Sequence, residues 1–155
     1  MSSARRASRQ LALQVLYAAD LAGRGSGGLT PEGVEASFAA VGDHFELREG
    51  ARAYAKELVT GVAQRRAEID ALLARHATHW RLERMAAVDR NVLRLAVYEM
   101  AWGGMPASVA IDEAIELARR FGSDRSPAFV NGVLDAIGRT LAGGALPDAP
   151  VGEGS

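Results

Sequence analysis

Two histidines stand close enough in the sequence to suggest metal chemistry. His76 and His79 are three residues apart, with Asp70 before them and Glu83 after them. Side chains at this spacing on a helix can share a face, and imidazole is a common zinc ligand. The segment has no HExxH motif and no third ligand at a suitable spacing. A histidine pair at a solvated helix end is the simpler interpretation, so we predict no metal site.

Motifs for other chemistry are missing as well. The chain has no cysteine, no GxxxxGK[ST] loop and no strand-linked GxGxxG, the motifs of thiol, nucleotide and dinucleotide chemistry. Asp112, Glu113 and Glu116 form an acidic cluster, but on a helix they pair more simply with Arg119 and Arg120. We therefore predict no catalytic residue, no enzyme activity and no cofactor.

Arginines near the N-terminus suggest binding to a polyanion. Arg5, Arg6 and Arg9 occur with no acidic residue before Asp20. Arginine side chains neutralise phosphates, and a position near a fraying helix end would let them follow a flexible strand. The alternative is an ordinary basic N-terminal turn, and the sequence alone does not separate the two.

Two aromatic residues are candidates for base stacking, which single-stranded RNA requires. Tyr17 lies on the same predicted helix as the arginines, and Phe129 lies near the start of a later helix beside Arg125. Aromatic residues at helical spacing usually belong to a core, and that alternative applies to both. The position of Phe129 next to an arginine favours the rim of a core.

Helices carry all of these residues. Apolar periodicity predicts helices over residues 4–22, 31–41, 47–76 and 87–102, and a brief one near 78–85. Thr30 before Pro31 is a helix start signal, and Gly61 is a candidate break. We find no strand-like alternation and no internal repeat. The predicted fold class is therefore all-α, with about seven helices.

The stretch 109–135 predicts two further helices joined by a short polar turn. Gly122 is expected to end the first helix with a positive φ. Ser126 as N-cap and Pro127 at the first helical position are expected to begin the second. The turn is thus defined from both sides.

Length and composition limit the organisation of the chain. With 155 residues, 48% of them hydrophobic, and a net charge of -1, the sequence suits one domain, which we predict over residues 1–142. Residues 143–155 are rich in glycine and proline and carry only acidic charges, which predicts a disordered tail. No signal-peptide pattern and no run of about 18 apolar residues is present. We predict a cytoplasmic protein that does not contact a membrane.

Several motifs resemble the NusB family of transcription antitermination factors. Two consecutive segments, AIDEAIELARRFG and SPAFVNGVLD, resemble the closing helices of the family. The segment VLRLAVYEM at residues 92–100 resembles the helix that precedes those closing helices. The family's arginine-bearing first helix is similar to RRASRQLALQVLYAAD. The resemblance runs in order over most of the chain and implies the family's fold, two small packed helical bundles sharing one core.

The resemblance also implies a function. NusB proteins bind the boxA element of ribosomal RNA leader transcripts together with the ribosomal protein NusE, and help RNA polymerase in the antitermination complex to resist termination. The NusE-facing surface implied here includes Asp89 and Arg90. Asn131, Gly132 and Asp135 also match the family motif; we interpret them as structural, with Gly132 allowing helices to approach closely and Asn131 or Asp135 satisfying backbone groups. The resemblance implies these RNA-facing residues: Arg5, Arg6, Arg9, Gln14, Tyr17, Arg125 and Phe129.

Other functions remain open. The same helical domain occurs at the N-terminus of ribosomal RNA cytosine methyltransferases, although this sequence lacks their long catalytic segment. A protein-interaction module that does not contact nucleic acid is the third option. The nearly continuous apolar cover of residues 11–22 also allows a homodimer, which would mask the N-terminal arginines.

Overall fold

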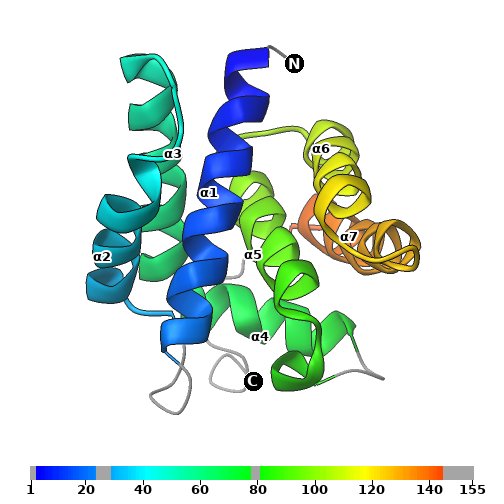
Figure 1. Ribbon diagram of the computed structural model, residues 1–155. Helices are drawn as coiled ribbons and strands as arrows, with labels where there is room; N and C mark the ends of the chain where they lie inside the picture. Colours follow the sequence, from blue (N-terminus) through cyan, green and yellow to red (C-terminus); the bar gives the residue numbers. More distant parts are fainter. Residues whose placement is uncertain (1–2, 24–28, 78–80, 145–155) are drawn as a thin grey trace. The chain divides into compact units, whose positions relative to one another are not determined.

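The helices expected from the sequence are present in a computed structural model of the chain, which describes residues 3–23, 29–77 and 81–144 (Figure 1). These residues form seven α-helices and one short 3-10 helix, η1, and none of them lies in a β-strand. The all-α prediction is confirmed. The chain divides into two compact units, Met1–Gln64 and Arg65–Ser155, each described by itself below. The single domain over residues 1–142 stays a prediction.

Some of the expectations fall outside the described residues. These are His79, part of the brief helix near 78–85, and all of the predicted tail beyond residue 144. Among the helices that the structure describes, none is long and apolar enough to span a lipid bilayer.

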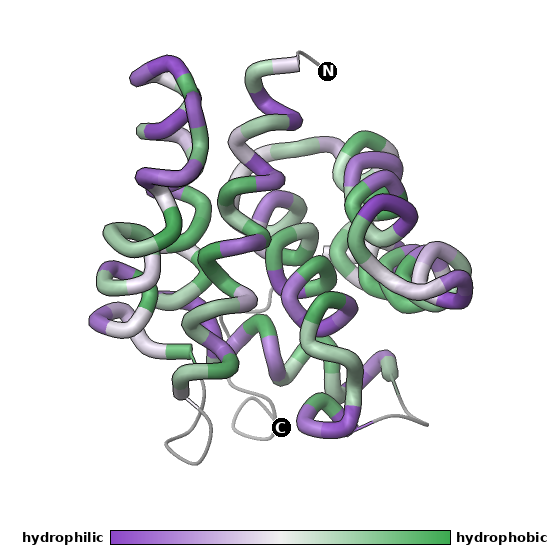
Figure 2. The backbone as a smooth tube through the Cα atoms, in the orientation of Figure 1, coloured by the Kyte–Doolittle hydropathy of each residue, from purple (hydrophilic) through white to green (hydrophobic). Residues whose placement is uncertain are grey.

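Three helices, α1 (Ser3–Ala22), α2 (Pro31–Gly42) and α3 (Glu49–Gln64), form the first unit, and each packs against the other two. Helix α2 begins as the sequence predicts, since the Thr30 hydroxyl accepts a hydrogen bond from the Gly33 amide at 3.0 Å and Pro31 follows. Hydrophobic and hydrophilic stretches alternate along the helices in Figure 2, the pattern of helices with one buried side. Apolar residues of α1 that are fully buried include Leu11, Val15 and Leu16.

Polar contacts hold the α2–α3 connection and the start of α1. The Ser8 hydroxyl donates to the Ala51 carbonyl of α3 at 2.7 Å, which ties the second turn of α1 to that helix. The Arg52 guanidinium donates to the carbonyls of Gly42 at 2.8 Å and Phe45 at 2.7 Å. The first unit therefore fixes the arginine-bearing turn of α1 against α3.

Four α-helices and η1 (Leu82–Arg84) form the second unit: α4 (Arg66–His76), α5 (Ala87–Ala101), α6 (Ala107–Phe121) and α7 (Ser126–Ala142). Helices α5, α6 and α7 pack against one another, and α4 packs against α5 and α7. Helix α7 buries a stripe of apolar residues at helical spacing, with Val130, Leu134 and Ile137 fully buried.

A bidentate ion pair joins α4 to α5. Arg94 donates from Nε to Asp70 Oδ1 at 2.9 Å and from Nη2 to Asp70 Oδ2 at 3.0 Å, and its Nη1 reaches Asn91 Oδ1 at 3.1 Å. The Arg94 side chain is only 5% exposed. Because a buried guanidinium without its carboxylate is costly, this pair constrains where α5 lies against α4.

The turn between α6 and α7 depends on Gly122 for a reason other than the predicted one. Its φ is -96°, so the expected positive φ is wrong. A Cβ at this position would lie 2.7 Å from the Ser126 Cβ and 2.8 Å from the Ala118 carbonyl oxygen. The Ser126 hydroxyl fills that space and accepts from the Ser123 amide at 2.9 Å. Gly122 is thus required because the two helices approach closely, not because of its backbone angle.

Three smaller expectations about α3 and α7 differ from the structure. Gly61 lies inside α3 and the interruption falls at Arg65, since packing can outweigh the roughly 1 kcal/mol that a helical glycine costs. Helix α7 begins at Ser126, one residue earlier than predicted, so Arg125 and not Ser126 occupies the N-cap position. Gly132 does not mediate a close approach, because a Cβ there would meet no atom within 4 Å.

The remaining polar motif residues of α7 do not satisfy backbone groups as expected. Asp135 pairs through Oδ2 with Arg139 Nη1 at 2.9 Å on the surface. Asn131 is exposed and makes no side-chain hydrogen bond within the described part of the chain. Asn131 and Asp135 therefore lie on the surface of α7 and do not stabilise the fold through hydrogen bonds to backbone groups of the described residues.

The two glycines of the closing helices give opposite predictions for stability. Gly122→Ala should lower the free energy of unfolding by about 1–3 kcal/mol, because the added methyl overlaps Ser126 and the Ala118 carbonyl. Gly132→Ala, in open space within a helix, should raise it by roughly 0.5–1 kcal/mol. Urea denaturation of both variants measures the difference. Equal stability of the two would contradict this account of Gly122.

The α4–α5 ion pair gives a second prediction. Asp70→Ala should destabilise the protein by about 3 kcal/mol, because the buried Arg94 guanidinium loses its bidentate pairing with this carboxylate. The control is Asp135→Ala, which removes an exposed pair in which Arg139 is 74% and Asp135 55% exposed. This change should cost about 0.5 kcal/mol or less. Thermal unfolding followed by circular dichroism compares them, and similar losses for both would show that burial of Arg94 is unimportant.

Candidate nucleic-acid interface

One face of α1 collects three of the predicted RNA-binding residues. With roughly 100° of rotation per residue, Arg6, Gln14 and Tyr17 fall on one stripe of the helix, together with Gln10. Arg6 is exposed, Tyr17 is 36% exposed, and the two glutamines are half-buried. The sequence reasoning missed Gln10, although its spacing of four from both Arg6 and Gln14 marks it. This stripe, which we call the α1 face, presents a cation, two amides and an aromatic ring in order.

The other two arginines of α1 turn toward α3. The Arg5 guanidinium carbon lies 3.8 Å from the ring centroid of Tyr54, and that of Arg9 lies 5.8 Å from the same ring. Arg9 Nη2 also donates to the Tyr54 hydroxyl at 3.5 Å, and Arg9 is only 1% exposed. Cation–π contacts of this kind orient a guanidinium without neutralising it. Arg5 is thus positioned yet exposed, whereas Arg9 is part of the packing, and Tyr54 had no sequence signal of this role.

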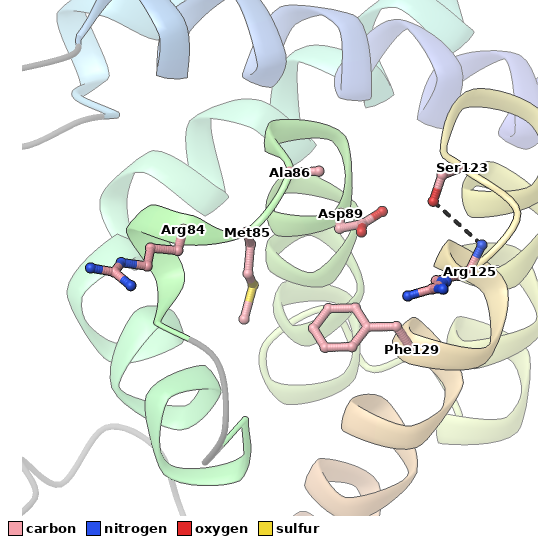
Figure 3. Close-up of a pocket in the computed structure, with 7 residues that line it drawn as sticks. All are labelled: Arg84, Met85, Ala86, Asp89, Ser123, Arg125 and Phe129. Atoms are coloured by element: carbon pink, nitrogen blue, oxygen red, sulfur yellow. Dashed lines mark hydrogen bonds between the residues drawn. The ribbon is translucent and has the colours of Figure 1, made fainter.

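A pocket of about 300 Å³ lies in the second unit, where η1 and the first turn of α5 face the α6–α7 turn. Figure 3 shows the carboxylate of Asp89 directed toward the side of Ser123 and Arg125, the ring of Phe129 extending below it, and the side chain of Met85 approaching that ring from the opposite wall. The pocket is lined by Arg84, Met85, Ala86, Asp89, Ser123, Arg125 and Phe129.

The α7 wall brings together the predicted pair Arg125 and Phe129. They are four residues apart, so they share a face of the chain entering α7, and Gly132 continues the same face. The Ser123 hydroxyl accepts from the Arg125 amide at 3.3 Å and helps to fix the turn. Arg125 is exposed and Phe129 is half-buried. A base could stack on the ring while the guanidinium contacts its phosphate.

The opposite wall contains Asp89, and Arg90 follows it in α5; the resemblance implied contact with NusE for both residues. Arg90 Nη1 donates to the carbonyls of Leu82 at 2.8 Å and Met85 at 3.0 Å, so its guanidinium holds η1 against the start of α5. Asp89 Oδ1 is buried and has no hydrogen-bond partner within the described part of the chain. An unsatisfied buried acceptor costs about 1–3 kcal/mol, so this oxygen requires an explanation.

Of the predicted pair His76 and His79, the structure describes His76, whose ring makes contacts within the fold. His76 Nε2 lies 2.7 Å from the Thr140 hydroxyl of α7, and Nδ1 lies 3.0 Å from the Leu72 carbonyl. Both ring nitrogens are therefore occupied: Nε2 joins α4 to α7, and Nδ1 contacts the preceding turn of α4. Among the described residues, no group of three or more potential ligands could hold a metal ion.

These features define a class of protein. The described part of the chain is helical and presents arginine and aromatic side chains on the α1 face and in the pocket. Cationic and stacking groups in this combination are typical of proteins that bind single-stranded nucleic acid.

Comparison with known proteins identifies the family. The model of the NusB family matches residues 6–139, so the chain belongs to the NusB family. A relative from Solibacter usitatus, named transcription antitermination protein NusB, is 45% identical over 150 residues, which cover 96% of this chain and 95% of the relative. A protein of the same name from Sorangium cellulosum is 48% identical over 141 residues, covering 89% and 94%.

Solved structures with the same fold include NusB of T. maritima, with a TM-score of 0.76 and 32% identity over 90% of this chain and 93% of that one. A crystal structure of the antitermination factors NusB and NusE in complex with double-stranded RNA has a TM-score of 0.72 and 28% identity over 90% and 99% of the two chains.

The contacts of Arg90 predict a structural role for this residue. Arg90→Gln should lower the free energy of unfolding by about 1.5–3 kcal/mol, since two carbonyl contacts to a charged donor are lost. It should also speed amide exchange in Leu82–Met85, measured by hydrogen–deuterium exchange. Arg84→Gln, an exposed residue of the same pocket, is the control and should leave the exchange unchanged. Unchanged exchange in the Arg90 variant would show that its guanidinium does not hold η1.

Proposed function

We propose that this protein is an RNA-binding transcription antitermination factor, which binds boxA-type single-stranded RNA together with the ribosomal protein NusE and helps RNA polymerase to resist termination. The observation that carries the proposal is the pairing of Arg125 with Phe129 in one pocket, in a chain whose first helix presents Arg6 and Tyr17 on one face. Each surface offers a cation for phosphate and a ring for stacking, the two groups that a single strand needs.

The comparisons support the partners in this proposal. Relatives that match nearly all of the chain are named as transcription antitermination proteins, and a structural neighbour contains NusB and NusE in complex with RNA. The match extends over almost the whole of the relatives as well as of this chain. This favours an antitermination factor over an accessory domain of a methyltransferase.

Each residue of the α1 face makes a different kind of contact with the RNA. Arg6 contacts phosphate, Tyr17 stacks on a base, and Gln14 contributes hydrogen bonds, with Gln10 beside them. Arg5 also contacts phosphate, since its stacking on Tyr54 leaves it exposed. Arg9 acts through Tyr54, because a side chain that is 1% exposed does not reach a phosphate without rearrangement.

We propose that Gly132 serves RNA binding, because the packing of α7 does not require a glycine at this position. A glycine in the middle of a helix costs roughly 0.5–1 kcal/mol relative to alanine, and nothing packs on it here. It follows Phe129 by three residues on the same face of α7. Because Gly132 has no side chain, space is left beside the Phe129 ring, and the sugar–phosphate backbone of a nucleotide stacked on that ring can occupy it.

The first turn of α5 was expected to face NusE, but the Arg90 guanidinium is engaged with the Leu82 and Met85 carbonyls. Arg90 therefore shapes this surface by holding η1, and direct contact with NusE falls to exposed neighbours. Such a factor needs no catalytic group of its own, so we propose that it is not an enzyme and acts in the cytoplasm, on nascent transcripts.

The test separates the phosphate contact from the stacking contact on the α1 face. Binding of fluorescent boxA-type RNA is followed by anisotropy at several salt concentrations, with and without NusE. Arg6→Ala should weaken binding and reduce the slope of log K against log salt by about 1, because one phosphate contact is lost. Tyr17→Ala should weaken binding by about 1–3 kcal/mol without changing the slope, because stacking releases no counterion.

Arg75→Ala is the matched control, since Arg75 is an exposed arginine of α4 that belongs neither to the α1 face nor to the residues lining the pocket. It should leave both affinity and slope unchanged. Equal effects of the Arg6 and Arg75 variants would contradict the assignment of the α1 face. Tight binding to NusE with no RNA binding at any salt would instead identify a protein-interaction module.

A further inference from the structure

We propose that the pocket between η1, α5 and the α6–α7 turn binds a guanine base, and that the Asp89 carboxylate selects it by accepting hydrogen bonds from the base's Watson–Crick edge. This inference rests on the proposed RNA-binding function and adds base selection to it. Asp89 thereby becomes a residue that determines RNA specificity, whereas its expected role was contact with a protein partner.

The Oδ1 atom of Asp89 is a buried hydrogen-bond acceptor without a donor among the described residues. Oδ1 is removed from solvent, yet no donor of the described chain satisfies it. Arg125 lines the same pocket without forming an ion pair with Asp89, and its own guanidinium has no partner among the described residues. Buried acceptors are normally paired, so a ligand that brings an N–H group would complete this one. Asp89 is half-buried as a whole, and rotation about its Cβ–Cγ bond is soft, so either oxygen can turn toward the pocket.

The walls of the pocket suit a flat aromatic ring. Phe129 forms one side and Met85 approaches from the other, as Figure 3 shows. Both side chains make favourable contacts with an aromatic ring, Phe129 by stacking and Met85 through its sulfur. A volume of about 300 Å³ is at the lower end for ligand pockets, which suits a single base better than an extended ligand. Exposed Arg125 at the rim can contact the phosphate of the same nucleotide.

The chemistry of an ionised carboxylate selects guanine among the four bases. A carboxylate only accepts hydrogen bonds, and it accepts two when adjacent donors face it. Guanine presents N1–H and the N2 amine side by side. Uracil flanks its N3–H with carbonyl oxygens, and adenine and cytosine place a ring nitrogen acceptor next to the amine, so each of the three brings a lone pair against the carboxylate. Guanine alone pairs with Asp89 without repulsion.

A protein partner could also supply a donor to Asp89, for example an arginine of NusE. The pocket favours a nucleotide because the acceptor is accompanied by an aromatic wall and by a cation at the rim, which together match base edge, base face and phosphate. A partner arginine would place its positive charge beside Arg125 and Arg84, which also lines the pocket.

The experiment measures base preference at one position of the RNA. The probes are fluorescent, uracil-rich single strands of about 12 nucleotides that carry one central guanine, adenine or inosine. Anisotropy titrations use the full chain, with and without NusE. The unsubstituted protein should prefer guanine over adenine by about tenfold, and inosine, which lacks the N2 amine, should lie between them. Asp89→Asn should reduce the preference to below about twofold, because the amide presents donors as well as an acceptor.

Asp112→Asn is the matched control, an identical change of charge at an exposed position on α6 outside the pocket, and it should keep the full preference. Circular dichroism of both variants shows that the helices are retained. An unchanged guanine preference in the Asp89 variant overturns the inference, as does a loss of NusE binding with that preference intact, which would assign Asp89 to the protein partner. RNA binding without any base preference in the unsubstituted protein also overturns the inference but leaves the proposed function standing. The absence of RNA binding at low salt, even with NusE, would overturn both.

Discussion

The close approach of Gly122 and Ser126 is the constraint on which the pocket depends. A methyl group on Gly122 would overlap the Ser126 side chain and the last turn of α6, so the chain can reverse here only with a glycine. The Ser126 hydroxyl then accepts from the Ser123 amide, and the Ser123 hydroxyl accepts from the Arg125 amide. These linked contacts set the direction in which α7 leaves the turn. They therefore set where Arg125 and Phe129 face the pocket.

The opposite wall is held by ionic contacts. Arg90 binds the carbonyls of η1, and Arg94 binds Asp70 of α4 one turn further along α5. Two arginines of α5 thus hold η1 and α4 against the helix that carries Asp89. Asp89 lies on this anchored helix with its Oδ1 unsatisfied by any donor of the described residues. The stability that this oxygen costs is offset by packing elsewhere in the unit.

Local sequence signals predicted the helices, the polar turn and the pairing of Arg125 with Phe129, because caps, periodicity and spacing act over a few residues. The prediction of a positive φ for Gly122 was wrong. A glycine at a helix end has the same sequence pattern whether it is needed for its backbone angle or for a close approach between helices. Tyr54 was not predicted as the partner of Arg5 and Arg9, since 45 residues separate Tyr54 from Arg9 in the sequence. The resemblance gave Asp89 and Arg90 one shared role. The structure shows two different environments, which depend on how η1 folds back onto α5.

The start of α1 has a consequence for the energetics of RNA recognition. Arg5 stacks on Tyr54 at 3.8 Å and Ser8 hydrogen-bonds to Ala51, so contacts with α3 order the turn that carries the arginines before any ligand arrives. A fraying turn would lose conformational entropy on binding, whereas an ordered one acts as a template. The entropy loss then falls on the nucleic acid, so that among strands of equal charge one that is already stacked in its free form would lose less entropy on binding.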